Sequence, residues 1–204
     1  VDRMAMLMRE NWFNIEDKNP LDSTATFSPS NQSYQNINDY YEDVTSGYKI
    51  SQGELSGKTP RYFFGGEGTD NPAASAVEDH FYGGGGDDTL NGREGNDYLE
   101  GGAGSDTYVV NPGDGFDTVF DVDGQGSIKF GSVVAEGRNG VTDGKNWVKI
   151  GNGWMDMGTG LVYVLSTQSN GAQDLLISFV SGADSARAVL KNWRDGDLGI
   201  TLGD

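Results

Sequence analysis

The chain has 204 residues, of which 31 are acidic and 14 are basic, giving a formal charge of -17. It contains 32 glycines, one histidine and no cysteine, and 35% of its residues are apolar, below the usual fraction of about 45–50%. So acidic a chain repels phosphate backbones, which argues against a nucleic-acid partner. No stretch is apolar enough to span a bilayer. Disulfides, thiolate metal sites and a multi-histidine zinc centre are excluded.

This composition raises the question of how the chain folds. Burial of so few apolar residues poorly offsets the backbone entropy lost on folding, and glycine makes that loss larger. Acidic, glycine-rich chains of this kind are therefore often disordered. Either the chain is disordered, or an external partner neutralises the carboxylates and orders the glycines, and a divalent cation would do both.

Residues 1–60 are predicted to be a leader of helix and loop. Apolar side chains from Met4 to Trp12 recur at helical spacing, which predicts a short amphipathic helix over residues 1–12. Residues 22–38 are polar and indicate a loop. One or two strands are expected around Tyr40, Tyr41, Tyr48 and Ile50.

Residues 61–130 contain a repeat of nine residues. Three consecutive units begin at Gly83, Gly92 and Gly101, with glycine first, glycine fourth, aspartate sixth and an apolar residue eighth. The frame extends backwards over two imperfect units and resumes after a slip of two residues beyond Val109. The sixth-position aspartates are Asp70, Asp79, Asp88, Asp97, Asp106 and Asp117.

The spacing of the repeat predicts a parallel β-solenoid. The glycines supply tight turns whose carbonyls can face a cation, and the eighth residue points inward from a short strand. Two units form one coil, so Asp70 stacks with Asp88, Asp88 with Asp106, and Asp79 with Asp97. A hard cation with about six to eight oxygen ligands fits between such carboxylates, and calcium fits better than magnesium, which demands stricter geometry. The predicted calcium site residues are Asp70, Asp79, Gly83, Gly84, Gly86, Asp88, Gly92, Gly95, Asp97, Gly101, Gly102, Gly104, Asp106 and Asp117.

Some units depart from the repeat. Residues 74–78 form no glycine loop, Pro72 occupies an apolar slot, and Arg93 and Glu94 replace small residues. The ions are therefore expected to be centred on Asp88, Asp97 and Asp106.

The tandem units resemble the glycine-aspartate nonapeptide of the RTX (repeats-in-toxin) exoproteins of Gram-negative bacteria. The segments 113–119 and 192–200 resemble regions that flank RTX repeats. The resemblance implies an all-β chain with a calcium-loaded parallel β-roll over residues 61–130, several bound calcium ions and no catalytic residues. It also implies a secreted protein, exported unfolded by the type I secretion machinery and folded by external calcium.

Residues 131–204 are predicted to form a mostly antiparallel β segment that caps the roll. Short apolar runs separated by turn residues carry this prediction. The runs are Ile128–Val134, Trp147–Ile150, Leu161–Leu165, Leu175–Val180, Ala188–Trp193 and Leu198–Leu202. Phe63, Phe64, Phe81 and Tyr82 are expected to fill the core of the roll.

Three other features carry alternatives. His80 is the only histidine and would be the base of a hydrolase triad if upstream domains supplied its partners, as in an RTX lipase. The frame points it outward, and no Gly-x-Ser-x-Gly elbow occurs. The tryptophans Trp147, Trp154 and Trp193 form either a glycan-binding platform of an adhesin or, as we favour, the cap of the roll. Residues 121–124 look like part of an EF-hand loop but lack its spacing and final glutamate, so they are interpreted as a continuation of the solenoid or as one more weak cation site. The acids Asp195 and Asp197 are interpreted as a turn.

Overall fold

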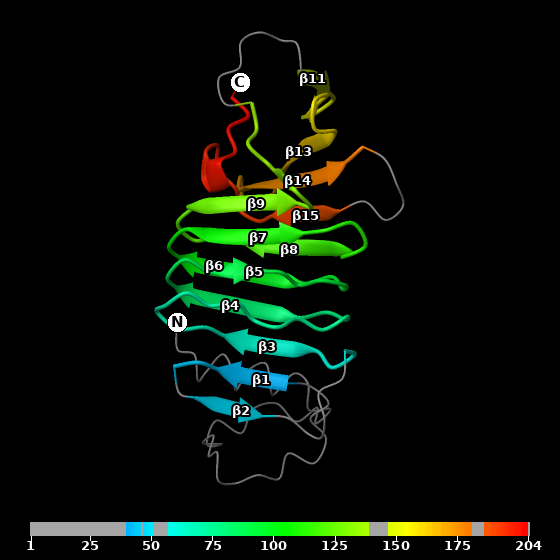
Figure 1. The fold of residues 1–204 in the computed structure, drawn as a ribbon. Coiled ribbons are helices and arrows are strands. Elements are labelled where there is room, and N and C mark those ends of the chain that lie inside the picture. Colours follow the sequence, from blue (N-terminus) through cyan, green and yellow to red (C-terminus); the bar gives the residue numbers. More distant parts are fainter. Residues whose placement is uncertain (1–39, 46, 51–56, 139–146, 181–185, 204) are drawn as a thin grey trace.

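The computed structural model describes residues 40–45, 47–50, 57–138, 147–180 and 186–203, which form fifteen strands and one short 3-10 helix. The expected helix at residues 1–12 lies outside the described residues. In Figure 1 the strands of the central segment lie above one another as the rungs of a solenoid, with the C-terminal strands at one end and β1 and β2 at the other. The all-β prediction is therefore confirmed for the described part of the chain.

The repeat region forms the expected parallel β-roll, whose two sheets face each other. One sheet contains β3 (Arg61–Phe64), β4 (His80–Gly85), β6 (Tyr98–Ala103) and β8 (Phe116–Phe120). The other contains β5 (Thr89–Leu90), β7 (Asp106–Val110) and β9 (Gly126–Phe130). Phe81 pairs with Leu99, one coil of eighteen residues further on, whereas Leu99 pairs with Val119. The larger second step accommodates the two-residue slip in the repeat.

The eighth-position side chains fill the space between the two sheets, as the repeat predicts. They are Phe81, Leu90, Leu99, Tyr108 and, after the slip, Val119 and Ile128, and all are at most 1% exposed. These residues belong to one continuous hydrophobic core together with Phe63. Successive side chains of a strand point to opposite faces, which explains why each short strand contributes one or two residues to this core.

Two aromatic residues expected in the core of the roll lie elsewhere. Phe64 and Tyr82 alternate with the core residues Phe63 and Phe81, so they point to the opposite face of the sheet. There the two rings stack on one another with centroids 5.1 Å apart. The core prediction is therefore right for Phe63 and Phe81. Phe64 is buried, at 1% exposed, but neither it nor Tyr82 belongs to the core cluster between the two sheets.

The strands expected near residues 40–50 are confirmed, and they extend the roll. β1 (Tyr40–Asp43) pairs in parallel with β3, and β2 (Tyr48–Ile50) pairs antiparallel with β1. These residues of the predicted leader thus add two strands to the first sheet, next to the first coil.

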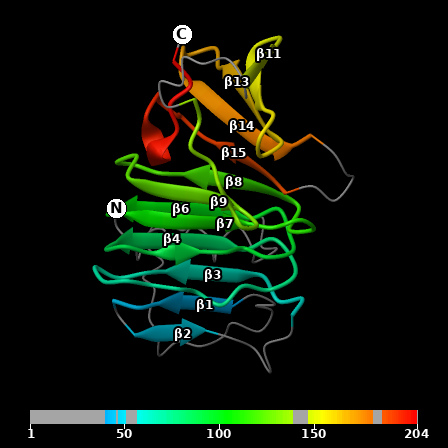
Figure 2. The ribbon, with the colours of Figure 1, turned by 45° about the horizontal axis from the view of Figure 1, so that its top comes forward.

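The C-terminal strands continue both sheets beyond the last coil. β15 (Arg187–Leu190) pairs in parallel with β8, and β10 (Val133–Val134) pairs antiparallel with β9. An antiparallel meander precedes β15, made of β11 (Trp147–Ile150), β12 (Gly153–Asp156), β13 (Leu161–Thr167) and β14 (Gln173–Phe179). The result is one sheet of eleven strands running from β2 to β11 (Figure 2). The meander was predicted in outline, although β12 was missed.

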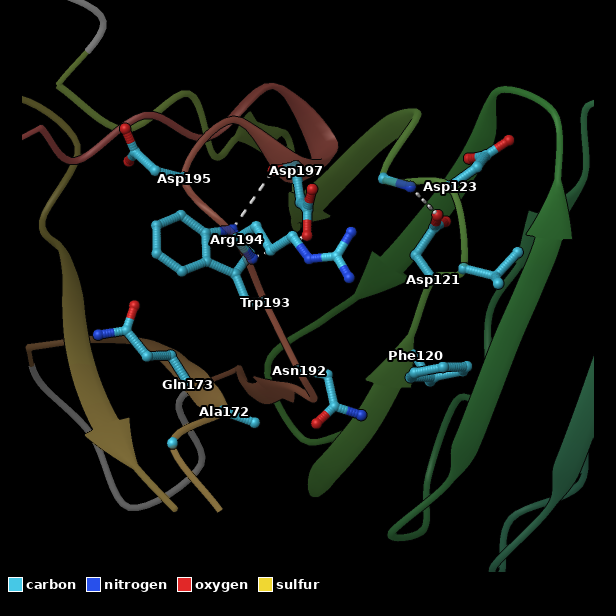
Figure 3. A pocket seen from close by; sticks show the side chains of 13 residues that line it. Phe120, Asp121, Asp123, Ala172, Gln173, Asn192, Trp193, Arg194, Asp195 and Asp197 are labelled. Atoms are coloured by element: carbon cyan, nitrogen blue, oxygen red, sulfur yellow. Dashed lines mark hydrogen bonds between the residues drawn. The ribbon is translucent and has the colours of Figure 1, made fainter. Parts of the chain in front are cut away.

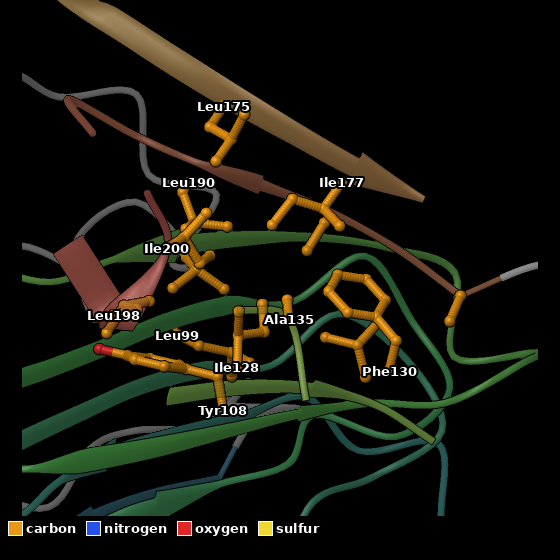
Figure 4. Close-up of a cluster of buried hydrophobic side chains, with 14 of the residues drawn as sticks. Leu99, Tyr108, Ile128, Phe130, Ala135, Leu175, Ile177, Leu190, Leu198 and Ile200 are labelled. Atoms are coloured by element: carbon orange, nitrogen blue, oxygen red, sulfur yellow. The ribbon is translucent and has the colours of Figure 1, made fainter. Parts of the chain in front are cut away.

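One predicted strand is wrong. Residues 198–202 do not form a strand, because η1 (Asp197–Gly199) is a 3-10 turn with Leu198 in the left-handed region at φ 53°. The turn buries Leu198, Ile200 and Leu202, which are at most 3% exposed. Figure 4 shows Leu198 and Ile200 packed beside the apolar residues of β9. The apolar residues of this run are therefore buried under the cap in a turn, and they do not form an extended strand.

Candidate metal centre

The sixth-position aspartates form two stacks, one on each edge of the roll. The first edge carries Asp70, Asp88 and Asp106, and the second carries Asp79, Asp97 and Asp117. In each stack the backbone N–H of one aspartate donates to Oδ1 of the aspartate one coil further on. The four N···Oδ1 distances are 2.7 Å for Asp70–Asp88, 2.9 Å for Asp88–Asp106, 2.8 Å for Asp79–Asp97 and 3.2 Å for Asp97–Asp117. The predicted pairing of the carboxylates is confirmed.

The second carboxylate oxygen distinguishes four of these aspartates. Asp88, Asp97, Asp106 and Asp117 are each at most 1% exposed. Their Oδ2 atoms are buried and have no hydrogen-bond partner in the protein. Buried polar atoms are nearly always paired, because each unpaired one costs about 1–3 kcal/mol. Four such oxygens in two stacks therefore indicate positions at which a cation is the missing partner.

The electrostatics of the stacks leads to the same conclusion. Burial raises the pKa of Asp97 to about 8, and the neighbouring carboxylates of Asp117 and Asp79 add to the effect. Burial likewise raises the pKa of Asp117 to about 7 and that of Asp88 to about 6. A positive charge beside these groups would reverse the shifts, since it favours the ionised form.

The predicted glycines lie where side chains would obstruct the carboxylates. A Cβ atom on Gly92 would lie 2.0 Å from Oδ2 of Asp97, and one on Gly101 would lie 2.1 Å from Oδ2 of Asp106. A Cβ atom on Gly83 would likewise lie 2.2 Å from Oδ2 of Asp88. The remaining predicted glycines have a positive φ and lie in the same turns. They are Gly84, Gly86, Gly95, Gly102 and Gly104. The first glycine of each unit thus leaves backbone, not side chain, against the unpaired oxygen.

These residues fit a calcium ion. Among the described residues, no three acidic or histidine side chains gather into a cluster that could hold a metal by themselves. Calcium accepts backbone carbonyls alongside carboxylates, and glycine turns next to an unpaired Oδ2 offer both. Asp88, Asp97, Asp106 and Asp117 would supply the charged ligands, and the turn backbones the neutral ones.

Two predicted ligands have protein partners instead. Oδ2 of Asp70 accepts the backbone N–H of Gly66 at 2.6 Å. Oδ2 of Asp79 accepts the backbone N–H of Ser75 at 2.6 Å, and its Oδ1 accepts the hydroxyl of Ser75 at 2.7 Å. Both aspartates belong to the coil that departs most from the repeat.

The structure adds residues that the sequence reasoning missed. The hydroxyl of Tyr108 donates to Oδ2 of Asp121 at 2.8 Å and accepts the N–H of Gly101 at 2.8 Å. Asp114 is buried and its charge adds to the raised pKa of Asp97. A signal for Tyr108 was present, because a phenol replaces the aliphatic residue of the two preceding units.

The turn at residues 121–124 ends the first edge of the roll. Leu198 donates its N–H to the carbonyl of Gly124 at 2.7 Å, and a Cβ on Gly124 would lie 2.4 Å from Oδ1 of Asp197. A cleft of about 680 Å³ lies beside this contact, lined by residues 120–124, 171–173, 192–195 and 197. Figure 3 shows Asp121 and Asp123 on one side of it and Trp193, Asp195 and Asp197 on the other. The C-terminal segment therefore covers the last turn, as expected of a cap.

The other candidates also have structural surroundings. His80 points away from the core, as predicted, and its ring stacks on Tyr62 at 4.8 Å while Nε2 lies 3.4 Å from Glu78. Trp193 is buried, and Trp147 and Trp154 pack against the core. These contacts favour the capping interpretation of the three tryptophans.

The fold and the two stacks of carboxylates define a calcium-binding β-roll. Residues 76–108 match the RTX calcium-binding nonapeptide repeat in four copies, so this segment is a block of RTX repeats. Searches among curated proteins and among solved structures give no match. Within the described residues, no helix has the length and apolar character needed to cross a membrane.

Proposed function

We propose that the chain is the calcium-binding module of a secreted bacterial exoprotein, which folds when it meets external calcium and stabilises its parent protein. The observation that supports this most directly is the set of four buried carboxylate oxygens without a protein partner. We divide the chain into a leader over residues 1–60, the roll over residues 61–130 and the cap over residues 131–204. The RTX repeat block itself is not catalytic.

The proposed mechanism couples ion binding to folding. Without calcium, forming the roll buries ionised aspartates beside one another, which raises the free energy of the folded state. Asp88, Asp97, Asp106 and Asp117 would hold calcium through their unpaired oxygens, and the binding free energy would then become folding free energy. The C-terminal strands lie against β8 and β9, where they cover the end of the roll that would otherwise be an exposed sheet edge.

Far-ultraviolet circular dichroism of the full chain tests this function. We expect a spectrum of an unfolded chain in chelator and a β spectrum in millimolar calcium. Magnesium at the same concentration and sodium chloride at the same ionic strength are the controls, because general screening would act without calcium. A spectrum that is the same with and without calcium would contradict the proposal.

Secretion is proposed from the resemblance to RTX exoproteins, which the repeat block supports. In this interpretation the machinery that exports the chain is of type I, and calcium-poor cytosol keeps the roll unfolded until export. Co-expression with a type I exporter should place the full-length parent in the medium. Retention of the parent in the cells with an active exporter would contradict the secretion proposal and leave calcium binding intact.

A further inference from the structure

The backbone of the aspartate-bearing turns falls into two classes. In four turns the residues at the second and fourth positions of the unit have a positive φ. The pairs and their φ values are Gly84 (102°) and Gly86 (104°), Arg93 (64°) and Gly95 (139°), Gly102 (110°) and Gly104 (126°), and Gly113 (93°) and Gly115 (104°). These are the turns of Asp88, Asp97, Asp106 and Asp117.

The two turns of the first coil have the other backbone. Gly66 and Gly68 lie outside the left-handed region, and so do Ser75 and Val77. In both turns the N–H of the second residue donates to Oδ2 of the aspartate four residues later, at 2.6 Å. The same oxygen has no partner in the four turns with positive φ. We call a turn closed when Oδ2 of its aspartate accepts this N–H, and open when that oxygen has no partner. In all six turns the backbone conformation distinguishes the two classes, since the four open turns have positive φ and the two closed turns do not.

Arg93 shows that the open conformation is maintained even where it is unfavourable. It is one of three non-glycine residues with a positive φ in the described chain, at 64°. A left-handed residue with a Cβ costs roughly 1–2 kcal/mol. The second unit therefore adopts the open turn against the preference of its own side chain, which is expected if that turn holds a ligand.

Ser75 closes the turn of Asp79 with two donors. Its N–H and hydroxyl bind the two carboxylate oxygens, and the N–H of Arg61 adds a third bond to Oδ1 at 2.8 Å. Three hydrogen-bond donors on one buried carboxylate offset the cost of burying its charge, which a cation would otherwise offset. Val77 stands where the open turns have glycine, and a β-branched side chain strongly resists positive φ.

Given the proposed function, we infer that the first coil is closed by its own hydrogen bonds and takes no calcium. The N–H of Gly66 closes the turn of Asp70, and Ser75 and Val77 exclude the ion from the turn of Asp79. The ions then begin at Asp88 on the first edge and at Asp97 on the second. The repeat block has four sequence copies, but only the copies with open turns bind.

Native mass spectrometry of the full chain in calcium tests the inference by counting ions. The matched variants are Asp79→Asn and Asp97→Asn, which make the same change in adjacent coils of one edge. We expect Asp79→Asn to keep the wild-type number of ions and Asp97→Asn to lose at least one. An ion lost from Asp79→Asn would overturn the inference.

A second matched pair on the first edge covers the case in which Asp79→Asn fails to fold. We expect Asp70→Asn to keep the wild-type number of ions and Asp88→Asn to lose at least one. An ion lost from Asp70→Asn would also overturn the inference. A wild-type chain that binds no calcium would refute the proposed function itself, and the inference with it.

Discussion

The sign of the pH dependence of stability should reverse when calcium is removed. Burial raises the pKa of Asp97 from 3.8 to about 8 and that of Asp117 from 3.8 to about 7 in the calcium-free fold. A carboxyl whose pKa is higher in the folded state contributes stability at low pH and loses it as the pH rises through that pKa. The calcium-free roll should therefore become less stable between pH 5 and pH 8.

The expected effect is large enough to measure. One pKa unit corresponds to about 1.4 kcal/mol, so ionising Asp97 alone at pH 8 costs on the order of 5 kcal/mol. That approaches the whole stability of a typical domain, about 5–15 kcal/mol. The calcium-free roll should thus be unfolded or nearly so at pH 8 and measurably more stable at pH 5. With calcium bound the carboxylates must be ionised, so acidification should then destabilise the roll.

Urea unfolding followed by circular dichroism at pH 5 and pH 8, with and without calcium, measures the reversal. Asp97→Asn removes the charge, so the calcium-free variant should lose much of its pH dependence. Glu94→Gln is the matched control, because Glu94 is an exposed carboxylate in the same turn. A calcium-free urea midpoint that rises from pH 5 to pH 8 would refute the reasoning.

Further predictions concern the turns and the core. Gly101→Ala should weaken calcium binding at least tenfold in a titration calorimeter, because its Cβ would lie 2.1 Å from Oδ2 of Asp106. Gly68→Ala is the control and should leave binding unchanged, because its Cβ would have nothing within 4 Å. Tyr108→Phe leaves the N–H of Gly101 without its acceptor and should lower the free energy of unfolding in saturating calcium by about 1–3 kcal/mol. An unchanged urea midpoint would contradict that role. Leu99→Ala, at a fully buried core position, should cost about 2–5 kcal/mol in the same assay.

The site was predictable from sequence to the extent that it follows from the repeat. Fixed spacing places aspartates in register, and the stacking of Asp79 on Asp97 and of Asp88 on Asp106 follows from two units per coil. The repeat includes Asp70 and Asp79 among the predicted ligands, although the departures in the first coil centre the expected ions on Asp88, Asp97 and Asp106, and we propose that the first two are not ligands. Spacing determines where a carboxylate lies, but it does not determine which donors reach it. Ser75, four residues before Asp79, was the available signal.

The fold beyond the repeat was harder to predict, for a physical reason. Apolar runs report burial, and burial is shared by strands and by buried turns. The apolar run at residues 198–202 predicts a strand, whereas Leu198 has a left-handed backbone and shapes a turn that packs under the cap. The expectation that Phe64 and Tyr82 fill the core of the roll overlooks the period of two along a strand, which decides the face that each side chain occupies.

The sequence by itself determined the two-sheet roll and predicted its calcium chemistry, because a nine-residue period repeats the same local geometry in every coil. Only the tertiary structure decided how the roll ends. β1 and β15 continue the sheet of β4, β6 and β8 from opposite directions, and hydrogen bonds from Gly66 and Ser75 close the first coil. The strand pairings join segments that do not share a repeat period, and the hydrogen bonds depend on the orientation of single peptide groups. Neither can be predicted from the spacing of residues.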